Sequence, residues 1–321
     1  MSALTALRRA HRAWSDYWFA GVDARSVGFM RVVLGVLMIW SQLSYLPEFA
    51  DIIGPEAFIE ARNATRTLDW ERFDVYSLAE TTEQARLIHL SFLLPMALFT
   101  LGLGGRFTAL VCLAGMVSLH HTNPWMQNGG DRILRVWLMA LLLVPCTRAL
   151  SLDAWLRSRR GKPLLPTVPV TAHRVIQLQT IVIYGMSGLD KAEGSTWRGG
   201  TAVYYAMSNL NFNRFPGLLD PILAWRPAQL MMQLSTWVTL AWELLFPVLV
   251  LFAPTRLLAI LIGLGVHTGI GLFVMVGSFS LGIMWTYLAF LDPDALGRWV
   301  GRRADALGIG RNPQSSDRAA S

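Results

Sequence analysis

The chain has 321 residues, of which 53% are hydrophobic and only 15% charged, and its mean hydropathy is +0.41. An average soluble domain carries about 25% charged residues, so this composition argues against a soluble enzyme, a disordered chain and a collagen-like repeat. It favours a multi-pass membrane protein, in which lipid covers the apolar surface. The net charge is +7, and Lys162 and Lys191 are the only two lysines among the 28 basic residues.

The first segment of the chain, residues 1–22, has the pattern of a basic amphipathic helix. Trp14 and Trp18 recur at helical spacing, opposite Arg8 and Arg12. A helix of this kind lies on a membrane surface, with its apolar face in the lipid. Binding to a partner protein is the other interpretation.

Eight later segments are apolar and long enough to cross, or nearly cross, a bilayer of about 30 Å. Because lipid cannot satisfy free backbone polar groups, each must be a helix. The segments lie near residues 27–46, 87–104, 107–122, 133–150, 174–190, 228–252, 257–276 and 278–291. We therefore expect an all-α helical bundle over 23–292, with outer loops at 47–86 and 191–227. An arginine-rich, largely disordered tail is expected over 293–321.

The distribution of basic residues predicts the orientation of these spans. If the N-terminus is cytoplasmic, 17 lysines and arginines fall in cytoplasmic segments and 9 on the opposite face. Cytoplasmic segments carry the excess of basic residues in membrane proteins, so both termini are expected in the cytoplasm. The positive charge then orients the spans, and we expect no nucleic-acid partner.

Four ionisable residues stand out inside the expected spans: Arg31, Arg135, Glu243 and His267. Ionisable groups in the membrane are costly and often functional. A structural interpretation is equally open, in which Glu243 neutralises Arg31 or Arg135 and so locks two helices together. His267 taken alone is more typical of a core histidine whose hydrogen bonds are satisfied.

Polar and aromatic side chains gather where the third apolar segment ends and the fourth begins. They are His120, His121, Trp125, Asn128 and Asp131. We expect no metal site there, because neither a third histidine nor a carboxylate stands at a convincing helical spacing.

The fifth apolar segment ends at the same outer face in this topology, and it carries Tyr184, Lys191 and then Trp197. A lysine at the end of an apolar helix can be desolvated, which lowers its pKa and makes the neutral amine available as a base or nucleophile. The structural interpretation is an ordinary interfacial lysine, paired with Asp190 or Glu193.

The ordered set of motifs resembles the HTTM (horizontally transferred transmembrane) family, whose best-known member is the vitamin K-dependent gamma-carboxylase. The resemblance covers about residues 27–292 and rests on several stretches in order. They are Met30-Arg31-Val32-Val33-Leu34-Gly35, Leu101 to Arg106, Trp125 to Leu134, Tyr184…Ser187-Gly188-Leu189-Asp190-Lys191…Trp197…Gly200, Glu243 and His267.

The resemblance implies a chemistry as well as a fold. In the carboxylase, a lysine of this motif deprotonates a vitamin K hydroquinone, whose oxidation drives carboxylation of protein glutamates. Lys191 would be that base and a reduced quinone the cofactor, with Tyr184, Trp197 and His267 in the pocket. His120, His121, Trp125 and Asn128 would join them. The family histidine that follows the asparagine is missing, and Asp131 stands nearby.

The expected setting is a bacterial inner membrane, with an exported peptide or protein as substrate on the outer face. A non-catalytic membrane partner, or a peptide-maturation or immunity factor, is the alternative function. Transport is less favoured, because the sequence lacks a pair of matching broken helices in two inverted halves.

Overall fold

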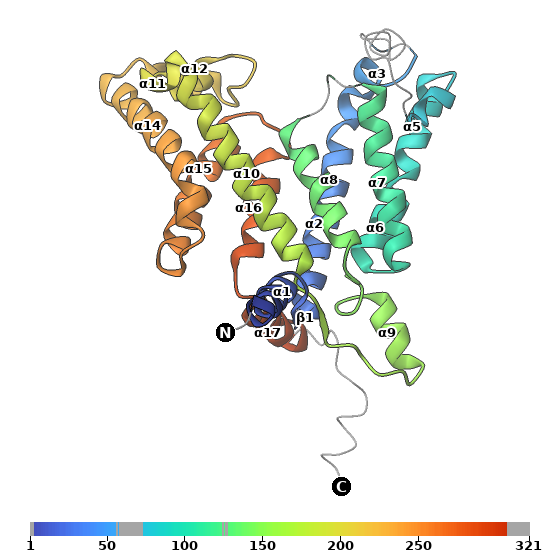
Figure 1. Ribbon diagram of the computed structural model, residues 1–321. Coiled ribbons are helices and arrows are strands. Elements are labelled where there is room, and N and C mark those ends of the chain that lie inside the picture. Colours follow the sequence, from blue (N-terminus) through green and yellow to red (C-terminus); the bar gives the residue numbers. More distant parts are fainter. Residues whose placement is uncertain (1–2, 56, 58–72, 124, 126–127, 307–321) are drawn as a thin grey trace. The chain divides into compact units, whose positions relative to one another are not determined.

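The computed structural model describes residues 3–55, 57, 73–123, 125 and 128–306 (Figure 1). The chain divides into two compact units. The first comprises residues 1–127, 134–175 and 291–321, and the second comprises residues 128–133 and 176–290. The boundaries fall inside two helices, α8 (Gly129–Leu142) and α10 (Thr171–Glu193). Each unit has its own core.

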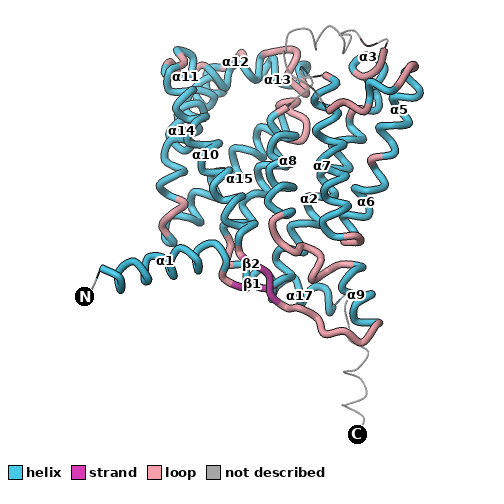
Figure 2. Tube along the Cα trace, turned by 45° about the vertical axis from the view of Figure 1, so that its right-hand side comes forward, coloured by secondary structure: helices cyan, strands magenta, loops and turns pink. Residues whose placement is uncertain are grey.

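The first unit is helical apart from one short pair of strands. Its helices are α1 (Ala3–Phe19), α2 (Ala24–Ser44), η1 (Leu46–Glu48), α3 (Phe49–Ile52), η2 (Tyr76–Leu78), α5 (Thr82–Ser91), α6 (Leu93–Leu101), α7 (Gly105–Thr122), most of α8, α9 (Leu152–Arg159), the first residues of α10, and α17 (Pro293–Ala306). Strands β1 (Gly21–Asp23) and β2 (Thr167–Pro169) pair in antiparallel register, with Val22 opposite Val168 (Figure 2).

Helices α2, α6 and α7 lie side by side in the first unit (Figures 1 and 2). Small residues allow the close approach of α2 and α6. A Cβ atom on Gly35 would lie only 2.9 Å from the Cα of Thr100, so no larger residue fits there. Close backbone contact at small residues is a usual way for apolar helices to associate in lipid, where hydrophobicity alone does not drive them together.

Arg31 of α2 is fully buried, and it bonds to backbone carbonyls rather than to a carboxylate. Its guanidinium donates hydrogen bonds to the carbonyl oxygens of Cys146, at 2.8 Å, and of Leu150. Gly102, which ends α6 at a left-handed φ of 72°, lies against this guanidinium, and a Cβ there would be 2.8 Å from Arg31 Cζ. Arg31 therefore ties α2 to the segment after α8.

Helix α17 packs onto the beginning of α2 through two glycines one turn apart. A Cβ atom on Gly297 would lie 2.6 Å from the Cβ of Asp23, and one on Gly301 would lie 2.9 Å from Arg25 Cζ. Asp23 is the N-cap of α2 and accepts a 2.8 Å hydrogen bond from the backbone N–H of Arg25. The capped end of α2 and the small face of α17 thus fit together.

Over its described residues, the second unit consists of helices and loops, with one isolated antiparallel bridge between Asn213 and Val274. Its helices are most of α10, α11 (Ser195–Arg198), α12 (Ala202–Ser208), α13 (Pro216–Leu223), α14 (Arg226–Leu249), α15 (Ala253–Phe273), α16 (Phe279–Thr286) and η4 (Tyr287–Phe290), together with the first turn of α8. The core consists of aromatic and aliphatic side chains from α10, α14, α15, α16 and η4, with Tyr184, Trp242, Phe246 and Tyr287 among its largest members.

Among the described residues, three helical stretches are long and apolar enough to cross a membrane. They are Ala24–Ile52, Thr82–Leu101 and Ala253–Phe273; Phe279–Phe290 is apolar but shorter. These helices fit an integral membrane protein. Each expected span overlaps a helix, but α8 ends at Leu142 and covers only the first part of the span expected at 133–150. Helices α7, α10 and α14 are not among the three candidate spans. The number of eight therefore stays a prediction, as does the membrane-surface role of α1.

The segment expected as a largely disordered tail, residues 293–321, begins with the helix α17. The expectation is wrong for this part, because the buried side chains of Leu296 and Val300 anchor α17 beside the two glycines. The rest of that segment, from residue 307, lies outside the described residues, as do residues 56 and 58–72 of the expected outer loop 47–86.

We predict that Gly297→Ala destabilises the protein by about 1–3 kcal/mol, because the added methyl group would overpack the contact with Asp23. Thermal unfolding in detergent micelles measures the effect. Gly265→Ala is the matched control, since nothing lies within 4 Å of a Cβ built there, and alanine favours a helix interior. Equal midpoints for the two variants would contradict the proposed packing.

The stability supplied by Asp23 should depend on pH. Burial by itself would raise the pKa of Asp23, but the hydrogen bonds and charge of Arg25 outweigh burial and hold that pKa below its ordinary value. The contribution is then fully present above the unfolded pKa of 3.8 and is lost as the pH falls through and below it. Asp23→Asn keeps an N-cap side chain but removes the charge that faces Arg25, so it should cost about 0.2–1 kcal/mol near neutral pH, and this cost should shrink at about pH 3. Unfolding midpoints at both pH values test this, and a cost independent of pH would refute it.

Candidate functional site

Lys191 and Glu243 form an ion pair in the second unit. Lys191 stands near the end of α10 and Glu243 in the second half of α14, with 2.6 Å between Nζ and Oε2. The side chain of Glu243 is 8% exposed and that of Lys191 23%. Lys191 also donates a hydrogen bond to the hydroxyl of Ser187, one turn earlier. An unpaired charge here would be expensive, so each residue stabilises the other.

A glycine brings the two helices close enough for this pair to form. A Cβ atom on Gly188 would lie 2.9 Å from the backbone nitrogen of Leu244 and 3.1 Å from the carbonyl carbon of Glu243. The backbones of α10 and α14 therefore meet at this point, three residues before Lys191. Within the Ser187-Gly188-Leu189-Asp190-Lys191 stretch, the glycine thus allows the helix contact that brings Lys191 to Glu243.

Trp197 lies over the ammonium group of Lys191, on the short helix α11 that follows α10. The distance from Nζ to the ring centroid is 5.2 Å, within the range of a cation–π interaction. A 3.2 Å hydrogen bond from the indole N–H of Trp237 to the carbonyl of Arg198 ties α11 to α14. Lys191 is thus surrounded by a carboxylate, a hydroxyl and an aromatic face.

A second group of polar side chains lies inside the core of the same unit. The hydroxyl of Tyr184 is 2.8 Å from Nε2 of His267 and 2.5 Å from the hydroxyl of Tyr287. Glu243 is within electrostatic range of both tyrosines, and Lys191 is within range of His267. The ion pair and this hydrogen-bonded chain therefore belong to one site.

Aromatic packing holds the hydrogen-bonded side chains of Tyr184, His267 and Tyr287 in place. Tyr184 contacts Trp242 and Phe246 at centroid distances of 4.6 Å and 4.5 Å. The indole N–H of Trp242 donates to the carbonyl of Ala259 at 2.8 Å, which fixes α14 on α15. His267 is 2% exposed, and its Nδ1 has no hydrogen-bond partner among the described residues. A buried ring nitrogen of this kind can serve a ligand.

Asn128, Asp131 and Ser278 form a third polar cluster of the second unit. Asp131 is fully buried and accepts a 2.8 Å hydrogen bond from the side-chain amide of Asn128, whose own oxygen accepts from the Asp131 backbone N–H at 3.0 Å. Ser278 adds longer hydrogen bonds to both side chains, at 3.3 and 3.4 Å. Asn128 and Asp131 support each other and the beginning of α8.

The remaining candidate residues belong to the first unit. His120 is buried near the end of α7, and His121 accepts a 3.2 Å hydrogen bond from the backbone N–H of Phe73. Trp125 is 77% exposed, and Arg135 lies in α8. A pocket that combines these residues with Lys191 stays a prediction.

Two partners differ from those expected. Glu243 pairs with Lys191, and not with Arg31 or Arg135, because Arg31 is satisfied by carbonyl oxygens. Lys191 likewise pairs across helices, while Asp190 and Glu193 are exposed.

Sequence reasoning assigned no role to Ser187 and Tyr287. Ser187 precedes Lys191 by four residues, and this spacing places both residues on one helix face. The spacing could therefore have revealed the contact between them. Tyr287 carries a hydroxyl group into an apolar segment, which is a weaker signal. No group of three or more histidine, cysteine, aspartate or glutamate side chains able to hold a metal is found in the described part of the chain.

A family model for the HTTM domain matches residues 19–295. The chain belongs to the HTTM domain family. No curated protein and no solved structure matches it significantly. The matched region of this HTTM domain contains every residue of the three polar groups described above, so the site lies within the part that defines the family.

We predict that Lys191→Met and Glu243→Gln each destabilise the HTTM domain by about 3 kcal/mol, because each leaves the other group without its partner. The double variant should lose clearly less than the sum of the two single losses. Free energies of unfolding in micelles provide this double-mutant cycle. Asp190→Asn, at an exposed neighbour, serves as the control. Strictly additive losses would mean that the pair does not couple the two helices.

Proposed function

We propose that this HTTM domain performs quinol-dependent chemistry of the vitamin K-dependent carboxylase type, with Lys191 as the base that deprotonates the quinol. The observation that carries the proposal is the Lys191–Glu243 pair, which is partly accessible and lies against Trp197. Family membership supports it, because the resemblance to the carboxylase assigns the base to this lysine.

The pair is suited to accept a proton. The amine of Lys191 and the carboxylate of Glu243 are 2.6 Å apart, so a proton that arrives at one of them is within hydrogen-bond reach of the other. In the uncharged form the amine of Lys191 can take the proton of a weakly acidic hydroxyl. The ring of Trp197 stabilises the resulting ammonium.

The surrounding residues fit an aromatic, lipid-soluble ligand. His267 has a buried Nδ1 without a partner among the described residues, and Met186 and Leu189 on α10 are more than half exposed. A reduced quinone would supply a hydroxyl proton and two electrons here, with molecular oxygen as the electron acceptor, and in the carboxylase type of reaction its oxidation drives carboxylation of a glutamate. His267 and Tyr184 would orient the ring, while Asn128 and Asp131 stabilise the fold nearby.

The same proposal includes the setting of the reaction. Eight spans with both termini in the cytoplasm would bring Lys191 to the outer face of a bacterial inner membrane, since α10 would then end there. An exported peptide or protein is the substrate expected at that face. Carbon dioxide would add to the side-chain carbon next to the carboxyl group of a substrate glutamate, after that carbon has lost a proton.

Oxygen uptake by purified protein in nanodiscs, with a vitamin K-type hydroquinone, tests the base. Lys191→Ala should lower the rate by about 100-fold or more, the usual contribution of a general base. Arg198→Ala is the control, because this exposed arginine is only seven residues away and its carbonyl, not its side chain, bonds to Trp237.

The variant Lys191→Met/Glu243→Gln separates the catalytic from the structural role. It should recover much of the stability that either single change loses, yet remain inactive, because it has no amine to accept the proton. Restored activity in this variant, or unchanged turnover in Lys191→Ala, would overturn the proposed role of Lys191.

A further inference from the structure

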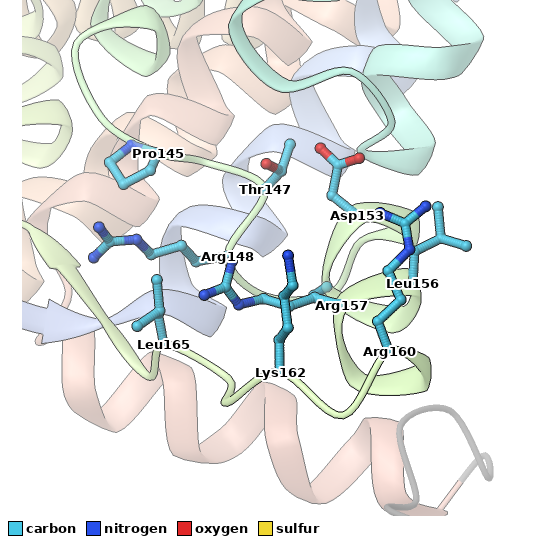
Figure 3. A pocket seen from close by; sticks show the side chains of 10 residues that line it. Pro145, Thr147, Arg148, Asp153, Leu156, Arg157, Arg160, Lys162 and Leu165 are labelled. Carbon is cyan, nitrogen blue, oxygen red and sulfur yellow. The ribbon is translucent and has the colours of Figure 1, made fainter.

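A separate cavity of about 410 Å³ lies in the first unit, between the turn after α8, the helix α9 and the loop that follows it (Figure 3). Its lining includes the side chains of Arg148, Arg157, Arg160 and Lys162, with Asp153 as the single carboxylate. This volume is typical of small-molecule sites. The cavity therefore offers a concave surface with a strong excess of positive charge.

The four cations are not neutralised by neighbouring acids. Among the described residues, no ion pair joins any of them to a carboxylate. Arg148 and Arg157 bond to the backbone carbonyls of Thr167, at 2.6 Å, and Pro163, at 2.8 Å. Those bonds position the two guanidinium groups without removing their charge, so Asp153 is the single carboxylate of the lining against four cations.

Arg160 and Lys162 remain available to a ligand. Both residues are exposed, and in the part of the chain that the structure describes neither side chain makes a hydrogen bond or an ion pair. They stand on either side of Gly161, whose left-handed φ of 66° turns the chain after α9. Two free cations thus stand beside two fixed ones at one cavity.

The walls of the cavity are anchored by buried interactions. The turn that carries Arg148 holds Leu150 at a positive φ of 52°, an unusual conformation for a non-glycine residue. The hydrogen bonds from Arg31 to Cys146 and Leu150 fix this turn. Ser151 caps α9 by accepting a hydrogen bond from the backbone N–H of Ala154 at 3.0 Å. The cavity therefore exists before a ligand arrives.

Apolar side chains accompany the cations. Leu156 and Leu165 line the cavity, and Leu165 is 39% exposed. On the same helix α9, Trp155 is 53% exposed and stacks on Arg159, with 5.1 Å from Cζ to the ring centroid. Exposed tryptophan and leucine beside arginine and lysine are typical of segments at the boundary between headgroups and acyl chains.

We propose that this cavity binds the phosphate headgroup of an anionic phospholipid. The four cations match a phosphodiester, and arginine in particular forms paired hydrogen bonds with phosphate oxygens. The acyl chains of a phospholipid would cover the apolar side chains next to the cations. A soluble phosphate ester has no such chains and would leave these side chains uncovered. This site does not depend on the chemistry at Lys191, because all its residues belong to the first unit.

The test uses the full chain purified in detergent and titrated with dioleoylphosphatidylglycerol or dioleoylphosphatidylcholine, with bound lipid counted by native mass spectrometry. The wild-type protein should retain phosphatidylglycerol in preference to phosphatidylcholine. Arg160→Gln/Lys162→Gln should weaken phosphatidylglycerol binding by about tenfold, because each basic group near a lipid surface contributes appreciably to anionic lipid binding.

Arg159→Gln/Arg302→Gln is the matched control, since it removes the same charge from two exposed residues outside the cavity. An equal loss in this control would show general attraction between charges, and would overturn the site. Displacement of the lipid by millimolar inorganic phosphate, with no preference for phosphatidylglycerol, would identify a free-anion site and overturn the lipid assignment. Unchanged unfolding midpoints of both variants in phosphatidylcholine confirm that the fold is intact.

Discussion

The cost of placing charge among apolar helices governs this structure. A buried charge is tolerated only when other groups compensate it, and the HTTM domain meets this requirement in two ways. Lys191 and Glu243 neutralise each other across α10 and α14. Arg31 instead collects carbonyl oxygens from the turn after α8. The first arrangement is a partly accessible pair of opposite charges, whereas the second is a buried cation that supports the fold.

Both arrangements depend on glycines at helix contacts. Gly188 brings the backbone of α10 against Leu244 and so places Lys191 within reach of Glu243. Gly102 leaves room for the guanidinium of Arg31 at the end of α6. In lipid, helices associate by close packing and polar contacts rather than by burying apolar surface. Small residues next to charges therefore help to hold these helices together, in addition to the apolar core of each unit.

The two polar centres of the chain have different chemical characters. The site of the second unit combines one coupled acid–base pair with a buried chain of Tyr184, His267 and Tyr287, and it suits proton transfer. The cavity of the first unit combines fixed and free cations, and it suits the binding of an anion.

The sequence by itself determined the helical class and the approximate positions of the apolar segments, and it singled out Lys191, Glu243 and His267 as candidate site residues. Composition and spacing carry this information because an apolar stretch in lipid has to be helical and an ionisable residue within it is exceptional. The HTTM resemblance also came from the order of the motifs, which needs no coordinates.

Only the tertiary structure decided which charges meet. The partner of Glu243 could have been Arg31, Arg135 or Lys191, since sequence position does not say which faces of two helices come together. Gly188 settled this in favour of Lys191, while backbone carbonyls satisfied Arg31. The same holds for Tyr287, whose hydroxyl group meets that of Tyr184 from a helix distant in sequence. The local sequence pattern determines where the helices form. Which charged side chains pair depends on how the helices pack, and packing is a property of the whole chain.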